Sequence, residues 1–241
     1  MIYTVTFNPA LDYVMKVEKL QFDDINRTYG EELNYGGKGI NVSVILSRLG
    51  VENTALGFQA GFTGEKLEEL LKADGIKTDF IALKNGMTRI NVKIKAQTEL
   101  DINAVGPPIE EDEVERLFEK IKAFQSGDVI VLAGSVPGTL PPDIYEKILS
   151  VTSKSGVESV VDATGDLLLN VLKYHPFLIK PNHFELGDLF GVKIRDEAEI
   201  EKYAKQLQEK GARNVLVSRG KEGATLITEH GGVHTIGIIS R

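Results

Sequence analysis

The sequence YGGKGINVSVILSRLG, residues Tyr35–Gly50, joins a glycine-rich turn to a helical pattern. Ile40 and Val44 belong to a set of apolar residues that recur at the spacing of one helix face. Gly50 stands where a helix C-terminal cap is expected, because glycine accepts the left-handed conformation that ends many helices. The pattern predicts a helix over Gly39–Leu49 that follows a tight turn, as in a strand-to-helix crossover.

Strand-like and helix-like segments alternate along most of the chain. The run VIVLAG, Val129–Gly134, is apolar without interruption, which is typical of a strand buried on both faces of a parallel sheet. The alternation predicts an α/β fold with a doubly wound, mostly parallel sheet flanked by helices. The predicted strands are Ile2–Phe7, Thr54–Phe58, Phe80–Leu83, Val129–Gly134 and parts of VESVVDATG, PFLIKPN and NVLVSRG; the predicted helices are Gly39–Leu49, Glu65–Ala73, a stripe over Val114–Ile121 and EAEIEKYAKQLQEKG.

Two segments depart from this alternation. YVMKV with RTYGEELNYGG, and TRINVKIKAQTELDIN, alternate with a period of two and have no helix between their strands. We interpret them as antiparallel ribbons that form a small β lid from residues 12–35 and 87–104. In an open parallel sheet, ligands bind beyond the carboxyl ends of the strands, and a lid over that edge would exclude water from a reaction.

Composition restricts the class of protein. The 241 residues are 42% hydrophobic, enough for one large α/β domain spanning residues 1–241. The formal charge of −7 and the scattered basic residues favour neither nucleic acid nor a membrane surface. The chain has no cysteine, and its N-terminus shows no secretory leader pattern. We therefore expect a cytoplasmic protein that acts on a small molecule.

The glycine-rich turn does not identify its ligand by spacing alone. It lacks the Gly-x-x-x-x-Gly-Lys-Ser/Thr spacing of a P-loop, and the chain contains no Gly-x-Gly-x-x-Gly. Gly36, Gly37, Lys38 and Gly39 offer backbone that a ligand can approach closely, N–H groups at a helix start, and one ammonium group. This spacing fits a phosphate-binding loop and a purely structural turn equally well.

Six short motifs that follow one another in a fixed order carry a family resemblance. Together they make the chain similar to the PfkB, or ribokinase-like, family of sugar kinases over nearly its whole length, from Ile2 to about Ile227. Within that family it most resembles the bacterial 1-phosphofructokinases, followed by the tagatose-6-phosphate kinases. The motifs are NPALD (residues 8–12), GGKGIN (36–41), TRINVKIK (88–95), LAGSVP (132–137), IKPNHFEL (179–186) and VSRGKEGA (217–224).

The resemblance assigns residues to the sugar phosphate that accepts the new phosphoryl group. A carboxylate suits sugar hydroxyls as an acceptor, and the planar fork of arginine grips phosphate oxygens in pairs. A serine in a Gly-Ser-x-Pro turn also fits simple turn chemistry. The family pattern implies Asp12, Gly36, Gly37 and Asn41 at the sugar hydroxyls, Lys38, Arg89 and Arg27 at the phosphate already on the sugar, and Ser135 near the sugar.

The resemblance also implies ATP and Mg²⁺ as cofactors. Asn182 and Glu185 match an Asn-x-x-Glu pair that organises Mg²⁺ through its waters, and hard oxygen ligands suit this ion. The same pair fits an Asn helix cap with Glu in the capping-box position, and the two roles are compatible. Asp162 ends a predicted strand, with no role assigned. The remaining implied nucleotide-site residues are Lys180, near the transferred phosphoryl group, and Ser218, Gly220 and Gly223.

Two further expectations concern metal and assembly. His230 and His234 are four residues apart, but no acidic third ligand lies near them in a glycine-rich segment, so we do not expect a metal site there. Exposed strand edges in the lid invite a partner, and together with the family resemblance they predict a homodimer through the lid.

The implied activity is ATP-dependent phosphorylation of fructose 1-phosphate to fructose 1,6-bisphosphate. The alternatives are a tagatose-6-phosphate or fructose-6-phosphate kinase, or a catalytically weak sugar-phosphate-binding relative. The family's Gly-Ala-Gly-Asp segment, which carries the catalytic base, is not among the 241 residues. We therefore identify no catalytic base and expect the C-terminally incomplete chain to be a poor kinase, with Lys180 as a stabiliser of the moving phosphoryl group.

Overall fold

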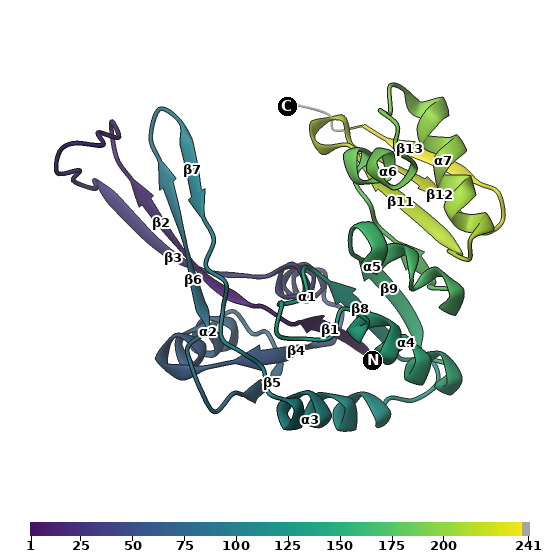
Figure 1. Ribbon diagram of the computed structural model, residues 1–241, viewed down its shortest axis with the longest axis horizontal. Coiled ribbons are helices and arrows are strands. Elements are labelled where there is room, and N and C mark those ends of the chain that lie inside the picture. The colour runs from purple at the N-terminus through teal and green to yellow at the C-terminus, as the bar shows by residue number, and fades with distance from the viewer. Residues whose placement is uncertain (238–241) are drawn as a thin grey trace. The chain divides into compact units, whose positions relative to one another are not determined.

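The computed structural model describes residues 1–237, and its contacts divide the chain into two compact units (Figure 1). The N-terminal unit comprises Tyr3–Leu117 and Gly134–Leu140. The C-terminal unit comprises Met1–Ile2, Phe118–Ala133 and Pro141–Arg241. The expectation of a single domain over residues 1–241 stays a prediction.

The body of the N-terminal unit is a layer of strands covered by helices. In sheet order, its strands are β1 (Ile2–Thr6), β4 (Asn53–Gln59) and β5 (Thr78–Ala82), with β4 and β5 parallel. The unit begins at Tyr3, so it includes β1 except for Ile2. Its helices are α1 (Lys38–Arg48), α2 (Gly61–Ala73) and the first part of α3 (Glu111–Lys122). Apolar side chains from α1, α2 and β4 meet Leu11 and Ile76, which lie outside these elements, in a buried cluster: Leu11, Ile40, Val44, Ala55, Leu67, Leu71 and Ile76.

Helix α1 forms as the sequence predicts. Gly50 follows its C-terminus with φ of 72°, and its N–H donates to the Ser47 carbonyl, so it has the predicted capping role. Gly39 explains how closely the helix approaches β1, since a β-carbon there would lie 2.5 Å from Thr6 Oγ1. One glycine of the quoted stretch is thus required by helix-to-strand packing, and another by helix termination.

The lid is one four-stranded sheet. Its order is β3 (Gly30–Gly36), β2 (Ala10–Lys16), β6 (Arg89–Lys95) and β7 (Glu99–Ile102). The β2–β3 and β6–β7 pairs are antiparallel, as expected, but the central β2–β6 pair is parallel. The two ribbons are therefore joined into one sheet. A parallel pair requires a long crossover, and α1, β4, α2 and β5 lie between β2 and β6 in the chain.

The register divides the lid into an apolar face and a polar face. Leu11 lies between Tyr35 and Ile90 on one face, and the next residue, Asp12, lies between Asn34 and Asn91 on the other. Side chains alternate between faces along a strand, so this register extends over the whole sheet. Further members of the apolar face are Tyr13, Met15, Leu33, Val92, Ile94, Leu100 and Ile102.

The C-terminal unit carries the other sheet strands. The parallel strands are β8 (Val129–Ala133), β9 (Glu158–Asp162), β10 (Leu178–Ile179) and β11 (Asn214–Ser218), and β12 (Ala224–Ile227) and β13 (Val233–Ile236) continue the sheet antiparallel. The apolar run VIVLAG is confirmed as a buried parallel strand. The α-helices are α4 (Ile144–Thr152), α5 (Gly165–Leu169), α6 (His183–Phe190) and α7 (Glu197–Glu209), the last part of α3 also belonging to this unit.

Over residues 1–237, no helix combines the length and the apolar character needed to cross a bilayer.

Candidate active site

Asp12 is held at both carboxylate oxygens within the N-terminal unit. Its Oδ1 accepts a 2.9 Å hydrogen bond from Asn91 Nδ2, and its Oδ2 lies 2.9 Å from Lys93 Nζ. All three side chains belong to the polar face of the lid. The Asp12 side chain is only 16% exposed, so these bonds fix a largely buried acceptor group.

The two adjacent glycines have separate structural causes. A β-carbon on Gly36 would lie 2.8 Å from Asp12 Oδ1, so only glycine leaves the carboxylate in its place. Gly37 has φ of 129° and caps the N-terminus of α1 without a side-chain hydrogen bond. Both features keep the helix start open beside Asp12.

Arg89 is partly buried, and backbone carbonyls hold its guanidinium. Its Nη1 donates to Ala104 O at 3.1 Å, its Nη2 donates to Asn8 O at 3.0 Å, and its buried Nε has no partner among the described residues. Burial lowers the pKa of the guanidinium, and the charge of Asp12 opposes that shift. A half-buried cation with an unused donor is suited to an anionic ligand.

The other acceptor-side candidates are exposed. Lys38 and Asn41 lie three residues apart in the first turn of α1, so they share one side of the helix. Gly134 brings the AGSVP turn to Lys38, because a β-carbon on Gly134 would lie 3.7 Å from Lys38 Cβ. Ser135 in that turn and Arg27 in the loop after β2 are both exposed. Their sugar-phosphate roles stay predictions.

The sequence analysis missed Asn91 and Lys93. They follow Arg89 at two-residue intervals along β6, so all three side chains lie on one face of the lid. That alternation was a usable signal within TRINVKIK. Their partner Asp12 is 79 residues away from Asn91 in sequence, and this pairing depends on the parallel register of β2 and β6.

In the C-terminal unit, polar residues gather where parallel strands end. Asp162 ends β9, Lys180 follows β10 and Ser218 ends β11. Lys180 Nζ lies 3.0 Å from Asp162 Oδ2. The carboxyl ends of parallel strands are the usual binding edge of an α/β sheet. The structure thus brings Lys180 to Asp162, the strand-end residue that had no assigned role.

Asn182 and Glu185 form a complete capping box at α6. Asn182 Oδ1 accepts from the N–H groups of Phe184 and Glu185, both at 2.9 Å, and Glu185 Oε2 accepts from Asn182 N at 2.7 Å. Asn182 also forms a parallel bridge to Ser218. The capping interpretation is therefore confirmed, and the two residues are fixed at the strand-end edge beside Ser218.

At the strand-end edge of the C-terminal unit, the Glu185 carboxylate is a donor that fits Mg²⁺. Glu185 supplies a carboxylate whose capping bond uses only Oε2, and Mg²⁺ on a nucleotide keeps most of its ligands as waters and phosphate oxygens. No cluster of three or more His, Cys, Asp or Glu side chains suited to a metal occurs among residues 1–237.

The turn after β11 has two unusual glycines. Gly220 has φ of 57° with open space around it, which leaves its backbone accessible. Gly223 has φ of 97°, and a β-carbon there would overlap the carbonyl oxygen of Ile236. Close packing against β13 therefore requires Gly223 for structural reasons, and the nucleotide-binding role of both glycines stays a prediction.

Comparisons with known proteins agree on one family. The model of the "pfkB family carbohydrate kinase" matches residues 5–241. The 1-phosphofructokinase of Bacillus subtilis strain 168 is 44% identical over 228 residues, which cover 95% of this chain and 75% of that protein. The D-tagatose-1-phosphate kinase of Bacillus licheniformis is 40% identical, covering 93% of this chain and 74% of that protein. Tagatose-6-phosphate kinases also occur among the relatives, at 34% identity.

A solved structure shows the same fold. Phosphofructokinase-2 from Escherichia coli, solved in complex with fructose 6-phosphate, superposes with a TM-score of 0.91 at 27% identity and covers 98% of this chain and 79% of that one. This similarity confirms the predicted ribokinase-like α/β fold, with its large, mostly parallel sheet flanked by helices.

Proposed function

Because the chain belongs to the pfkB family of carbohydrate kinases, we propose that it transfers the γ-phosphoryl group of ATP to fructose 1-phosphate. A hydroxyl oxygen of the sugar forms the new bond to phosphorus, the bond to the ADP oxygen breaks, and the hydroxyl proton is released. The observation that carries this proposal is the anchored Asp12 carboxylate with the partly buried Arg89 guanidinium near it in the same unit. A polyol that bears a phosphate needs both groups.

On the acceptor side, the residues orient the sugar phosphate. Asp12 accepts from sugar hydroxyls, Gly37 and Asn41 border the sugar at the start of α1, and Arg89 and Lys38 bind the existing phosphate. Arg27 and Ser135 are secondary contacts in this proposal. Both are exposed loop residues.

On the nucleotide side, the residues hold MgATP. The bound Mg²⁺ would neutralise developing negative charge on the phosphates, and Glu185 with Asn182 would orient its waters. Lys180 contributes a positive charge at the transferred phosphoryl group, and the turn bearing Ser218 and Gly220 offers backbone to the nucleotide. The proposal places the enzyme in the cytoplasm, where ATP is available.

The acceptor is tested by direct competition between substrates. Fructose 1-phosphate, fructose 6-phosphate, tagatose 6-phosphate and D-tagatose 1-phosphate are assayed side by side with MgATP. We expect the highest kcat/KM with fructose 1-phosphate. A higher value with any of the other three would replace the proposed acceptor by that sugar.

The catalytic base is a separate part of the proposal. None of the 241 residues forms the Gly-Ala-Gly-Asp sequence that the family resemblance places at the base. We propose that a polypeptide of these 241 residues binds both substrates but transfers phosphoryl groups slowly, since positioning alone supplies only part of the catalysis. Rapid turnover by the purified polypeptide would contradict this, and binding without any turnover would favour the sugar-phosphate-binding alternative.

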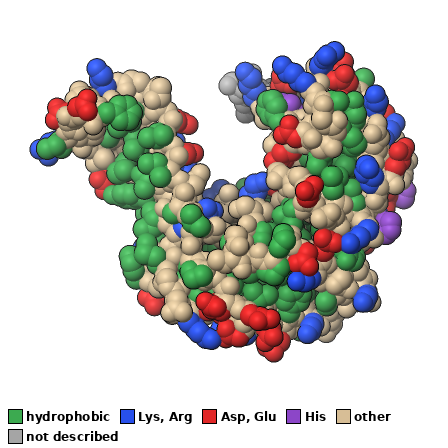
Figure 2. All heavy atoms as spheres, in the orientation of Figure 1, with side chains coloured by type: hydrophobic (Ala, Val, Ile, Leu, Met, Phe, Trp, Pro, Cys, Tyr) green, Lys and Arg blue, Asp and Glu red, His purple; other side chains and the backbone are tan. Residues whose placement is uncertain are grey.

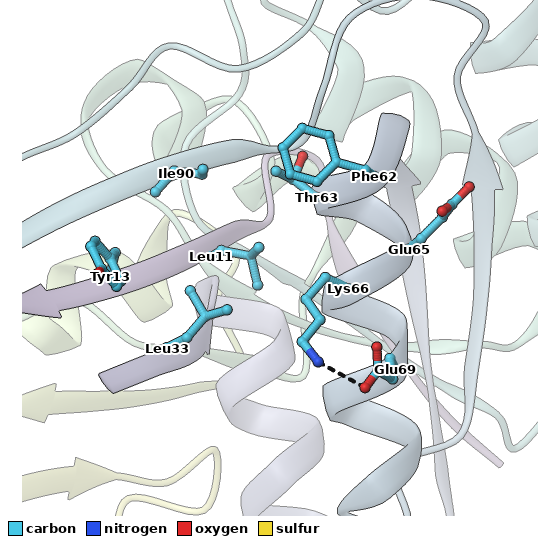
Figure 3. Close-up of a pocket in the computed structure, with 9 residues that line it drawn as sticks. All are labelled: Leu11, Tyr13, Leu33, Phe62, Thr63, Glu65, Lys66, Glu69 and Ile90. Atoms are coloured by element: carbon cyan, nitrogen blue, oxygen red, sulfur yellow. Dashed lines mark hydrogen bonds and ion pairs between the residues drawn. The ribbon is translucent and has the colours of Figure 1, made fainter. Parts of the chain in front are cut away.

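We further propose that the chain forms a homodimer through the apolar face of the lid. Hydrophobic side chains gather along the lid in the view of Figure 2, and Leu33, Leu100 and Ile102 of the apolar face are exposed. A cavity of about 500 Å³ lies between this face and α2, and Phe62, Leu11 and Ile90 are among its lining residues (Figure 3). A second lid would cover this surface, since an exposed apolar sheet face invites association.

Light scattering after size-exclusion chromatography tests the dimer. The unsubstituted chain should have about twice its monomer mass of 26.5 kDa. The Leu33→Glu variant should become monomeric, because it buries an unpaired charge in the interface. Leu49→Glu is the matched control, since Leu49 is exposed at the end of α1 and does not line the cavity. A monomeric unsubstituted chain would refute the proposal.

A further inference from the structure

We propose that Asn91 and Lys93 are positioning residues that fix the orientation of the Asp12 carboxylate for the hydroxyls of the sugar phosphate. The identity of that ligand comes from the proposed function, on which this assignment rests. The three side chains come from two neighbouring strands, β2 and β6, and lie on the polar face of the lid.

Asn91 is a buried side chain whose orientation is determined by its partners. Its Oδ1 accepts a 3.3 Å hydrogen bond from the backbone N–H of Ala104, which can only donate. Its Nδ2 therefore faces Asp12 and donates to Oδ1 at 2.9 Å. A flipped amide would set two donors against each other at Ala104 and two acceptors at Asp12. The amide thus has one favourable arrangement, and Asp12 is bonded to a fixed donor.

Lys93 holds the other carboxylate oxygen. It lies two residues along the same face of β6, and its Nζ is 2.9 Å from Asp12 Oδ2. The hydrogen bond to Asp12 raises the pKa of the Lys93 ammonium even though partial burial acts against it. Lys93 is therefore a charged donor to the Asp12 carboxylate.

These two donors leave Asp12 with a defined set of remaining acceptor sites. A carboxylate has about four lone-pair sites, two on each oxygen. Asn91 occupies one on Oδ1 and Lys93 occupies one on Oδ2, which leaves about one on each oxygen for a ligand. Gly36 adds no side chain to this space, because even a β-carbon there would lie 2.8 Å from Oδ1. Two hydroxyls of a sugar match two fixed acceptors, which need no reordering on binding.

The affinity test compares three variants of the full chain by titration calorimetry. Asn91→Leu and Lys93→Met should each weaken fructose 1-phosphate binding about tenfold, because each frees one carboxylate oxygen. Binding of MgATP should change less than about twofold in both. Lys95→Met is the matched control, since Lys95 is an exposed lysine two residues beyond Lys93 on the same strand. Sugar-phosphate affinity equal to that of Lys95→Met in both variants would overturn the assignment.

A double substitution separates positioning from direct contact. In an Asp12→Ala background, Asn91→Leu and Lys93→Met should cause no further loss of sugar-phosphate affinity, because they act through the missing carboxylate. A further tenfold loss in that background would show direct binding and would overturn the positioning role.

A ligand-free measurement decides the same point independently of the substrate. Crystal structures of the Asn91→Leu and Lys93→Met variants should show Asp12 in more than one rotamer, whereas the unsubstituted chain should show one. A single unchanged Asp12 rotamer in both variants would overturn the assignment. If the unsubstituted chain binds MgATP but no sugar phosphate, the proposed function is wrong, and the Asp12 rotamers still decide this inference.

Discussion

The N-terminal and C-terminal units fix their polar side chains by different means. In the N-terminal unit, Asp12 and Arg89 stand on neighbouring lid strands and are held by residues distant in sequence. In the C-terminal unit, Asn182 and Glu185 hold each other within four residues at a helix start. Both units pair an aspartate with a lysine, Asp12 with Lys93 and Asp162 with Lys180. The difference is that one unit relies on strand register and the other mainly on a local capping motif.

Arg89→Ala should cause the largest difference between the affinity for fructose 1-phosphate and the affinity for MgATP. It removes a charged donor group from the acceptor side, and we expect fructose 1-phosphate affinity to fall by about 100-fold, corresponding to roughly 2–3 kcal/mol. MgATP affinity should stay within about twofold. Arg89→Lys is the control that keeps the charge but loses the planar fork, and it should recover only part of the affinity. Equal losses of both ligands in Arg89→Ala would contradict the assignment of Arg89 to the sugar phosphate.

Glu185→Gln should have the second-largest effect, now on the nucleotide side. The glutamine carbonyl can still accept from Asn182 N, so α6 keeps its capping box while the negative charge is lost. We expect the Mg²⁺ concentration for half-maximal ATP binding to rise about tenfold. The thermal midpoint and fructose 1-phosphate affinity should not change. An unchanged Mg²⁺ requirement would leave Glu185 with a structural role only.

Gly36→Ala and Gly220→Ala test one small change in each unit. In Gly36→Ala the new methyl group displaces the Asp12 carboxylate, and sugar-phosphate affinity should fall about fivefold, roughly 1 kcal/mol. In Gly220→Ala the residue must adopt a φ near 57°, which costs about 1–2 kcal/mol of folding stability. Calorimetry and thermal unfolding read the two effects separately. Loss of sugar-phosphate affinity in Gly220→Ala would contradict the assignment of sugar-phosphate binding to the N-terminal unit alone.

Asn182 gives the smallest expected change, in stability. Asn182→Ala removes the side-chain cap of α6 and should lower the free energy of unfolding by about 1 kcal/mol. Asn182→Ser keeps a capping oxygen and should cost only a few tenths of that. If the serine variant is as stable as the parent but binds MgATP more weakly, the amide has a role beyond capping. Identical MgATP affinity in the two variants and the parent would limit Asn182 to the cap.

Sequence patterns predicted most of the architecture because those features are local. The helix at Lys38–Arg48, the buried strand Val129–Ala133 and the Asn182–Glu185 cap all follow from residues within one element or one turn. Their periodicity, glycine positions and capping spacing are properties of short segments. The same is true of the glycine-rich turn before α1, although spacing alone left its ligand open.

Tertiary structure decided what lies between distant segments. The parallel pairing of β2 with β6 could not be inferred from alternation, since a period of two fits either strand direction, and only this pairing places Asn91 and Lys93 on Asp12. Packing also decided that Gly39 and Gly223 are required by close backbone approach. The sequence by itself thus determined many of the elements and the local cap, while the strand register determined which polar groups meet, because side chains remote in sequence become partners only when the sheet aligns them.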